Sequence, residues 1–479
     1  MSHDSSHVEE FIASDRDRAL LGIIYGRRRI GKSTMLVDQV VNKNGFYFEA
    51  TRAETRVQLD RLGRQLGEYL GVGSLALPDW DSAFAALLRV GERSAVPVPV
   101  VLDEFGHIKE ADPGVDSVLA AALGPGARHS AAPNRTRLIL CGSAISMMRS
   151  LTAGQAPLRG RAGMELVMWP DDYRIAATRL PKDAGDETTM RTFCVIGGVV
   201  GYATDMVNFD LPCNLTDFDR WVVDRTLSAA ATLHREAATL LAEDPTVAGS
   251  GSLLHHSLLS VIANGSVTAG AIANGVGKQV SNISPVLNRL IDAGFIVRHS
   301  DPIRAQRALY ALSDSFLQFH YAVLDPYGPL LRNRPPSEVW KDRLRHVFDS
   351  QVRGPVFEEV ARTWVRRFAN SSTVAPNGHI GPSRVAIEGV ERELDVVVAE
   401  PGDVPGERAV IAIGEAKAGE QLDANHLQRL ESARSALGAR ANDAKLLLFG
   451  ARVDRDLARV ANRRPDVEIV DLDRLYHGD

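Results

Sequence analysis

The sequence predicts an α/β protein in which several domains follow one another along the chain. Through the first 164 residues, apolar runs typical of buried strands alternate with segments of helical periodicity, which predicts a parallel sheet covered by helices. Strands and helices alternate again after residue 346. A chain of 479 residues has room for about three domains of ordinary size.

The composition is that of an ordinary globular protein, with 45% hydrophobic and 24% charged residues. The net charge of −5 means that any surface for nucleic acid must be local. Cys141, Cys194 and Cys213 form neither a disulfide framework nor a zinc-binding spacing, which indicates a reducing compartment. The N-terminus is polar and no apolar run reaches 18 residues, so we expect a cytoplasmic protein with no membrane partner.

The first strand, Leu20–Tyr25, leads into a glycine-rich loop and then into a helical pattern. The loop fits the pattern G-x-x-x-x-G-K-[ST] and is followed by Thr34; its residues are Gly26, Arg27, Arg28, Arg29, Ile30, Gly31, Lys32 and Ser33. In such a loop backbone N–H groups surround phosphates and the helix N-terminus adds positive potential. Lys32 would reach the β- and γ-phosphates of ATP and Ser33 would hold Mg²⁺. A surface turn is the alternative, but the motif is complete and correctly placed.

The next apolar strand, Pro97–Leu102, ends in two adjacent carboxylates. Asp103 would hold Mg²⁺ and Glu104 would polarise the attacking water. Adjacent carboxylates at a strand end are often only a solvated turn. The phosphate-binding loop upstream favours the functional interpretation.

A third strand, Arg137–Gly142, is followed by Ser143, which would sense the γ-phosphate or cap a helix. The loop Ala156–Arg161 comes next. Arg159 or Arg161 would place a cation near the transferred phosphate, either in cis or across a contact between subunits of a homo-oligomer. A solvated basic loop is the alternative.

The segments GRRRIGKSTML, VVLDEFGHI, LILCGSAISMM and APLRGRAG, in this order, resemble the archaeal-type AAA+/STAND ATPases. The resemblance implies a P-loop ATPase core over residues 1–164 and a helical lid over residues 165–250. Two features depart from the family. Residues 1–18 are expected to carry little structure, with Phe11–Arg18 as a remnant of a base-contacting helix. Val200 stands where the family has a proline in the lid.

Residues 251–325 read as a winged helix, with helices near 253–262, 267–274 and 280–293 and strands at 295–298 and 308–312. Polar and basic residues near the third helix would enter the major groove of DNA, and two arginines in the wing would contact phosphate; these are Lys278, Ser281, Asn282, Asn288, Arg289, Arg304 and Arg307. An interaction module that binds protein is the alternative.

A proline-rich, charged linker, 327–345, leads to a domain at 346–479. Asp395 and Glu415-x-Lys417 on adjacent strands match the PD-(D/E)xK nuclease pattern, with Glu358 on the preceding helix as a third carboxylate. The carboxylates would hold Mg²⁺ and Lys417 would position water. Salt-bridged strand ends would explain the same residues. The region resembles the C-terminal domain of unassigned function (the DUF234 type) fused to these ATPases.

Two functions follow from these patterns. The first is an ATP-driven DNA-processing enzyme whose last domain cleaves DNA. The alternative is a nucleotide-gated regulatory switch or DNA-binding adaptor whose last domain is a catalytically inactive platform. A defence or mobile-element ATPase is a third interpretation that the sequence neither supports nor opposes.

Overall fold

The computed structural model describes residues 3–124, 133–244, 246–249, 251–305, 307–374 and 378–479. The chain divides into two compact units. Unit 1 comprises residues 1–169 with the returning segments 240–250 and 292–294, and unit 2 comprises the remainder. Each unit is described by itself.

Unit 1 is built on a five-stranded parallel sheet with the strand order β2-β3-β4-β1-β5. The strands are β1 (Leu20–Tyr25), β2 (Phe46–Glu49), β3 (Val98–Asp103), β4 (Thr136–Gly142) and β5 (Ala162–Val167). All four pairings are parallel, as the alternation of apolar strands and helices predicts. Because β4 lies between β1 and β3, the loops after these three strands are neighbours at the carboxyl-terminal ends of the strands.

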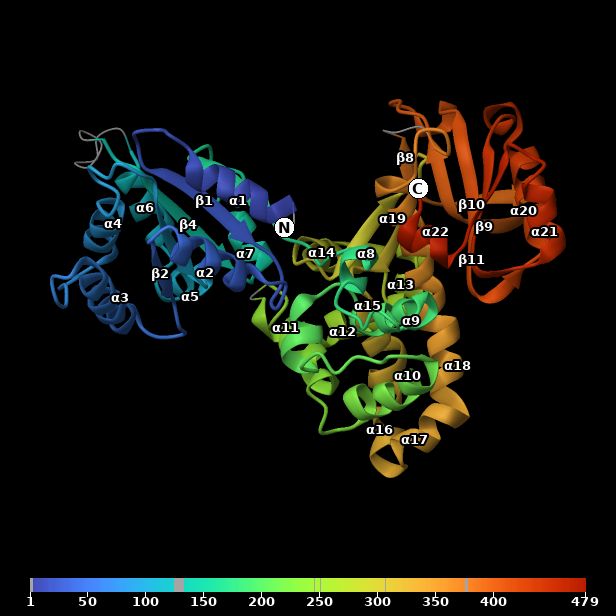
Figure 1. Cartoon of the computed structure of the whole chain (residues 1–479), viewed down its shortest axis with the longest axis horizontal. Coiled ribbons are helices and arrows are strands. Elements are labelled where there is room, and N and C mark those ends of the chain that lie inside the picture. Colours follow the sequence, from blue (N-terminus) through green and yellow to red (C-terminus); the bar gives the residue numbers. More distant parts are fainter. Residues whose placement is uncertain (1–2, 125–132, 245, 250, 306, 375–377) are drawn as a thin grey trace. The chain divides into compact units, whose positions relative to one another are not determined.

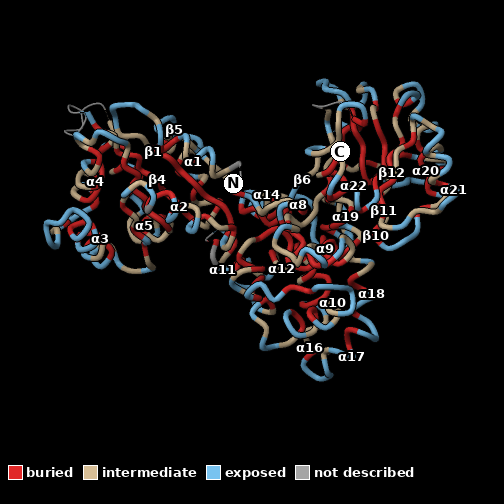
Figure 2. Tube along the Cα trace, viewed as in Figure 1, coloured by how far each residue is buried: buried red, intermediate tan, exposed pale blue. Residues whose placement is uncertain are grey.

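Helices accompany this sheet, and Figure 1 labels most of them. They are α1 (His3–Ala13), α2 (Lys32–Asn42), α3 (Thr55–Leu70), α4 (Trp80–Leu88), α5 (Phe105–Ala111), α6 (Val115–Ala122) and α7 (Ile145–Ser150). The apolar stripe Leu59, Leu62 and Leu66 of α3 is buried in the same core as Ile23 and Leu102 of the sheet. Figure 2 shows the strands as mostly buried, so the core rests on the apolar runs that the sequence displays.

The N-terminal segment differs from the expectation of little structure. It forms α1, an 11-residue helix in which Val8, Phe11 and Ile12 are buried. Phe11 packs against β1, because a side-chain carbon added at Gly22 would lie 3.0 Å from its ring. The prediction was wrong because three apolar residues among polar neighbours are enough to dock a short helix on a sheet.

Strand β5 was not anticipated from the sequence. It is an edge strand, with Gly163 and Glu165 exposed and only partly buried residues between them. It crosses residue 164, where the expected core was to end. Half-exposed edge strands lack the continuous apolar run that identifies buried ones.

Unit 2 begins with helices and short helical turns. The helices are α8 (Tyr173–Ala177), α9 (Asp186–Ile196), α10 (Leu215–Val222) and α11 (Glu236–Glu243), the last of which crosses into unit 1. Turns of π or 3₁₀ geometry connect them at Tyr202–Met206, Val223–Leu227 and Thr232–Arg235. The helical pattern predicted for this region is therefore present.

Three helices and a two-stranded hairpin follow, at the predicted places. They are α12 (Ser252–Ala263), α13 (Ala269–Gly275), α14 (Val280–Asp292), β6 (Ile296–Ser300) and β7 (Ala308–Leu312). Ile283, Val286, Leu287 and Leu290 give α14 one buried face. The hairpin is antiparallel, with Arg298 opposite Tyr310.

Residues 327–345 are helical, so the expectation of a linker was wrong. The helical elements between residues 315 and 353 are α15 (Ser315–Phe319), α16 (Asp325–Asn333), α17 (Pro336–Val339), α18 (Arg345–Val347) and turns at His320–Leu324, Trp340–Leu344 and Phe348–Arg353. Pro336 stands in the first turn of α17, where a missing N–H does no harm. Val339, Trp340 and Leu344 are buried, so packing rather than propensity decides the conformation.

A second five-stranded sheet, of order β12-β11-β10-β9-β8, carries the C-terminal part of unit 2. Its strands are β8 (His379–Ile387), β9 (Val390–Ala399), β10 (Val410–Leu422), β11 (Lys445–Val453) and β12 (Val467–Val470). The accompanying helices are α19 (Gly354–Arg367), α20 (Ala424–Leu437), α21 (Arg455–Ala461) and α22 (Leu472–His477). The sheet is mixed, since β10, β11 and β12 are parallel while β8 and β9 are antiparallel.

Across the ranges that the structure describes, no helix combines the length and the apolar character needed to cross a membrane.

Candidate functional site

The loop between β1 and α2 is shaped by two glycines. A side-chain carbon at Gly26 would lie 2.3 Å from the carbonyl oxygen of Met168, so only glycine fits there. Gly31 has a φ of 93°, in the left-handed region that glycine adopts without strain. Arg29 also has a positive φ, of 66°. The loop is thus a built structure, and α2 begins at Lys32 directly after it.

Lys32 is buried, with 6% of its surface exposed, and its ammonium turns back into the loop. Its Nζ donates hydrogen bonds to the carbonyl oxygens of Gly26 at 2.8 Å and Arg27 at 2.9 Å. Arg27 and Ile30 are buried as well, whereas Arg28, Ser33 and Thr34 are exposed. An ammonium held at the start of a helix, beside a loop of backbone amides, gives this edge of the sheet positive potential.

Asp103, at the end of β3, lies beside this loop. Its Oδ2 accepts a hydrogen bond of 2.7 Å from the Ser33 hydroxyl, and its Oδ1 accepts one of 2.8 Å from the Glu104 N–H. The Tyr47 hydroxyl also donates to Oδ2. Burial opposes ionisation of Asp103, yet hydrogen bonds from the Cys141 thiol, Tyr47, Ser33 and the Glu104 amide lower its pKa. The structure therefore brings together an ionised carboxylate and a hydroxyl at one point, which is a donor set that suits Mg²⁺.

Glu104 has a φ of 50°, an uncommon conformation for a residue other than glycine. Its Oε2 accepts a hydrogen bond of 3.0 Å from the Ser143 hydroxyl at the end of β4. Ser143 thus contacts the neighbouring carboxylate, and it stands two residues ahead of the helix α7 (Ile145–Ser150). Backbone strain of this kind is common where a side chain must be held for a function.

Tyr47 and Cys141 were not recognised as site residues from the sequence. Burial, followed by the hydrogen bond to Asp103, raises the pKa of Tyr47. Burial, followed by the negative charge of Asp103, raises the pKa of the Cys141 thiol. Both lie on strands next to β3, and only the strand order reveals that they reach Asp103.

Arg159 and Arg161 are not brought to this loop. They precede β5, which runs parallel to β1 with Ala162 beside Leu21 and Val167 beside Tyr25. Arg159 and Arg161 therefore lie at the amino-terminal ends of the strands, about 16 Å along the strands from the phosphate-binding loop. Both are exposed. Arg161 lines a cleft of about 1160 Å³ together with residues of α1, the segment 14–21 and β5.

Unit 2 holds the four residues of the nuclease-like pattern close together. The Lys417 Nζ lies 3.3 Å from Glu415 Oε1 and 3.6 Å from Asp395 Oδ2. Asp395 Oδ2 also accepts a hydrogen bond of 2.8 Å from the Ala416 N–H. Glu358 on α19 lies beside the same cluster, since Arg362 is 3.8 Å from Glu358 and 2.8 Å from the Asp395 carbonyl oxygen. Desolvation, followed by the charge of Asp395, raises the pKa of Glu358.

Two arginines that the sequence did not single out complete this carboxylate cluster. Arg429 on α20 lies 3.1 Å from Glu415 Oε1. Arg362 on α19 donates to the Asp395 carbonyl oxygen at 2.8 Å and lies 3.8 Å from Glu358. Burial would lower the pKa of Lys417, but Asp395, Glu415 and Glu358 outweigh it and raise the pKa. The carboxylates are thus balanced by cations of the chain itself.

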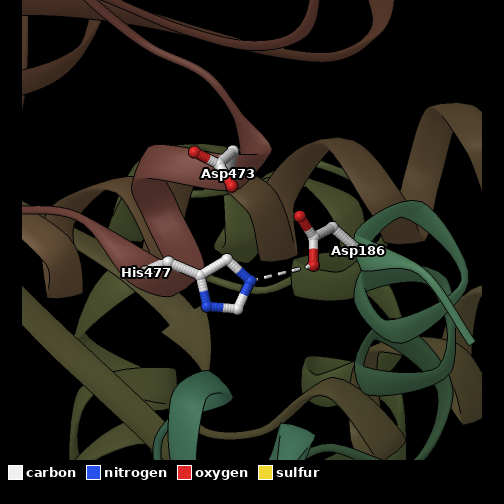
Figure 3. A group of neighbouring side chains, drawn as sticks. All are labelled: Asp186, Asp473 and His477. Atoms are coloured by element: carbon white, nitrogen blue, oxygen red, sulfur yellow. Dashed lines mark ion pairs between the residues drawn. The ribbon is translucent and has the colours of Figure 1, made fainter. Parts of the chain in front are cut away.

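The ligand atoms of Glu358, Asp395 and Glu415 do not converge on one point. Within the described part of the chain, one group of three His, Cys, Asp or Glu residues has ligand atoms within 4.8 Å of one another, namely Asp186, Asp473 and His477 (Figure 3). Asp473 and His477 are exposed, and the 3.4 Å ion pair between His477 and Asp186 accounts for this geometry. A Mg²⁺ ion held by Glu358, Asp395 and Glu415 therefore does not fit the cluster as it stands.

The polar residues of the three-helix region are divided in two sets. Lys278, Ser281, Asn282, Asn288 and Arg289 are exposed at or near α14. By contrast, Arg304 and Arg307 between β6 and β7 are paired with Glu391 of β9 at 3.1 Å and 3.0 Å. The contact of these two arginines with phosphate stays a prediction.

Comparisons with known proteins give distant likenesses. No family model matches the chain. The uncharacterized protein MJECL04 of Methanocaldococcus jannaschii is 24% identical over 353 residues, which is 72% of each protein. A solved structure of the Walker-type ATPase PABY2304 of Pyrococcus abyssi is 19% identical and has a TM-score of 0.49, covering 67% of this chain and 95% of the other.

Two further solved structures have lower TM-scores. The ORC2 protein of Aeropyrum pernix, in ADPNP–ADP complexes, is 14% identical with a TM-score of 0.40 and coverages of 69% and 91%. Cdc6p of Pyrobaculum aerophilum is 13% identical with a TM-score of 0.34 and coverages of 70% and 95%. Since all three scores lie below 0.5, the description of the site rests on the geometry of this chain.

Proposed function

We propose that unit 1 binds ATP with Mg²⁺ and hydrolyses it. The observation that carries this proposal is the contact of 2.7 Å between the Ser33 hydroxyl and the ionised Asp103, beside a buried lysine at the start of α2. Ser33 and Asp103 would hold Mg²⁺, which when bound neutralises charge on the β- and γ-phosphates.

The other residues of this edge have distinct roles in the proposal. Lys32 exchanges its contacts with the carbonyls of Gly26 and Arg27 for phosphate oxygens. Glu104 accepts a proton from the attacking water, and Ser143 holds the Glu104 carboxylate until the γ-phosphate is in place. The amides of the loop from Gly26 to Thr34 bind the phosphates.

Lys32→Ala tests this function. We expect the variant to lose ATP turnover, measured as released phosphate, while Lys43→Ala, in the turn directly after the same helix, keeps the wild-type rate. Unchanged turnover in pure Lys32→Ala protein would contradict the assignment.

We further propose that Arg159 and Arg161 act on the nucleotide of a neighbouring copy in a homo-oligomer. The two arginines lie at the amino-terminal ends of the strands, whereas the phosphate-binding loop lies at the carboxyl-terminal ends. This position supports the proposal, because about 16 Å of strand separates the arginines from the loop of the same chain. In the neighbour they would neutralise charge that develops during phosphoryl transfer.

For unit 2 we propose that α12 to β7 form a winged helix that binds DNA and that the carboxylate cluster belongs to a PD-(D/E)xK-type domain. The exposed polar face of α14 supports the first part. The ion pairs of Lys417 with Asp395 and Glu415 support the second. For cleavage, Arg429 must leave Glu415 so that a metal ion has access.

A catalytically inactive platform within a nucleotide-gated regulator is the second candidate for this domain. It is favoured by the ion pair of Arg429 with Glu415 and by the charge balance of the cluster. Cleavage of duplex, single-stranded and branched DNA with Mg²⁺ separates the two. A nuclease loses cleavage in Asp395→Ala and in Glu415→Ala, whereas a platform cleaves none of the substrates in its wild-type form.

A further inference from the structure

Three arginines gather around one carboxylate at the junction of the β6–β7 hairpin and the C-terminal sheet. Arg307 contacts both oxygens of Glu391, at 3.0 and 3.1 Å, and Arg304 donates to Oε1 at 3.1 Å. Arg384 on β8 lies 3.9 Å from Glu391 and also pairs with Glu393. The charge of the buried Asp301 also acts on Arg307, so three guanidinium groups are matched by three carboxylates.

The geometry of this group is that of an anion site. A guanidinium that contacts two oxygens of one anion has the arrangement used for carboxylate and for phosphate alike. Arg307 and then Arg304 hold the pKa of Glu391 at about 2, so its side chain is ionised throughout the ordinary pH range. The side chain of Glu391 is 48% exposed, so a solvent-borne anion can reach the same arginines.

The hairpin does not depend on Glu391 for its position. Asp301 accepts a hydrogen bond of 2.8 Å from the buried Ser383 hydroxyl of β8, and Ile303 is buried in the core of the sheet. Arg408 donates to the Pro302 carbonyl oxygen at 3.0 Å. Arg304 and Arg307 would therefore stay in place if another anion replaced the Glu391 carboxylate.

Arg304 and Arg307 lie between β6 and β7, in the segment that forms the wing of the proposed winged helix. Arg384 is directly opposite Glu393 in the register of β8 and β9. A DNA backbone that contacts the wing would thus reach these arginines with a phosphate.

We propose that Arg304, Arg307 and Arg384 form a binding site for a DNA backbone phosphate, and that Glu391 occupies it in the absence of DNA. The inference rests on the proposed binding of DNA by unit 2. It assigns the wing arginines to a site shared with the C-terminal sheet, and it gives Glu391 the role of an internal competitor.

The test uses the full chain and a fluorescent 30-base-pair duplex of mixed sequence, with Kd measured by anisotropy at several salt concentrations. Glu391→Gln removes the competing charge, so we expect Kd to fall about threefold to tenfold. The double variant R304Q/R307Q should bind more weakly, and its slope of log Kd against log salt should decrease by about one, because one phosphate contact is lost. Arg334→Gln, at an exposed arginine paired with Glu338 and Asp342, should equal wild type.

Tighter binding by Glu391→Gln cannot arise from misfolding, so this variant decides the question. If it binds no more tightly than wild type, or if R304Q/R307Q keeps the wild-type salt slope, the inference is overturned. Equal binding by all variants would overturn the inference but leave DNA binding by unit 2 intact. Absence of binding in every variant would overturn both, and ATP turnover in the same samples reports on unit 1 independently.

Discussion

At Asp103 a single carboxylate collects the Ser33 and Tyr47 hydroxyls, the Cys141 thiol and the Glu104 amide. These donors fix its orientation and keep it ionised despite 1% exposure. Loss of a group that orients a metal ligand in this way typically weakens metal binding about tenfold to 100-fold. Tyr47 is therefore a positioning residue in the proposed site.

We expect Tyr47→Phe to raise the Mg²⁺ concentration for half-maximal ATP hydrolysis by about tenfold, because Asp103 loses a donor that orients it. Tyr69→Phe is the matched control, since the Tyr69 hydroxyl donates to the Asn44 carbonyl oxygen. Titration of hydrolysis with Mg²⁺ measures the difference, and identical curves for Tyr47→Phe and wild type would refute this role.

The buried His320 makes the stability of unit 2 depend on pH. Burial, with His256 and His234 nearby, lowers the pKa of His320 to about 4. The unfolded chain therefore binds a proton at higher pH than the folded one, and stability is lost as the pH falls from about 6.5 towards 4. The loss is at most about 3 kcal/mol in the free energy of unfolding.

Replacing His320 by Leu should reduce the drop in Tm between pH 7.5 and pH 5. His346→Leu, at an exposed histidine, should leave the drop unchanged. Thermal unfolding at both pH values provides the measurement, and equal drops in His320→Leu and wild type would exclude this source of acid sensitivity.

At the scale of elements, a buried arginine of β4 holds the segment that joins α1 to the sheet. Arg137, at the start of β4, is fully buried and donates to the carbonyl oxygens of Ser14, Arg16 and Arg18. One side chain thereby satisfies the backbone of the segment that joins α1 to β1. Backbone acceptors that lose a donor are costly, so this arginine adds to the apolar contacts that dock α1.

Arg137→Ala should destabilise unit 1 by about 2–4 kcal/mol and release α1, because a fully buried side chain is removed and three backbone carbonyl groups lose their donor. Hydrogen exchange should report faster exchange of the α1 amides, and Arg89→Ala, in an exposed pair with Glu92, should not change them. Full protection of α1 in Arg137→Ala would show that the apolar contacts of Phe11 and Ile12 suffice.

Elements with a continuous apolar run or a complete motif could be predicted from the sequence, as β1, β3, β4 and the loop of Lys32 show. The edge strand β5 could not, because its half-exposed residues alternate with the polar Glu165 and with glycine. Proline masked the helices α16 and α17, whose conformation depends on buried Leu331 and Trp340. The partners of the site residues, such as Tyr47 and Arg429, come from elements distant in sequence, so only the fold reveals them.

For the whole molecule, the parallel pairing of β1 and β5 separates two features that a single active site would need, because one follows β1 and the other precedes β5. The phosphate-binding loop lies at the carboxyl-terminal ends of the strands, and Arg159 and Arg161 lie at the amino-terminal ends. One copy of the chain thus has a nucleotide site at one end of the strands and two arginines at the other end. Such an arrangement generates head-to-tail contacts between copies.

A mixing experiment tests this arrangement. Lys32→Ala and the double variant R159A/R161A should each hydrolyse little ATP alone. Mixed in equal amounts, they should recover part of the wild-type rate, because the second supplies intact loops and the first supplies intact arginines. A mixture with no more activity than its components would contradict action between subunits.

In the proposed reaction, Glu104 activates water beside the Ser33–Asp103 pair. The decisive measurement compares ATP binding and ATP hydrolysis in Glu104→Gln and wild type at saturating Mg²⁺. We predict binding close to that of wild type and hydrolysis reduced about 100-fold or more, the usual contribution of a general base. Hydrolysis at the wild-type rate in Glu104→Gln would contradict the account.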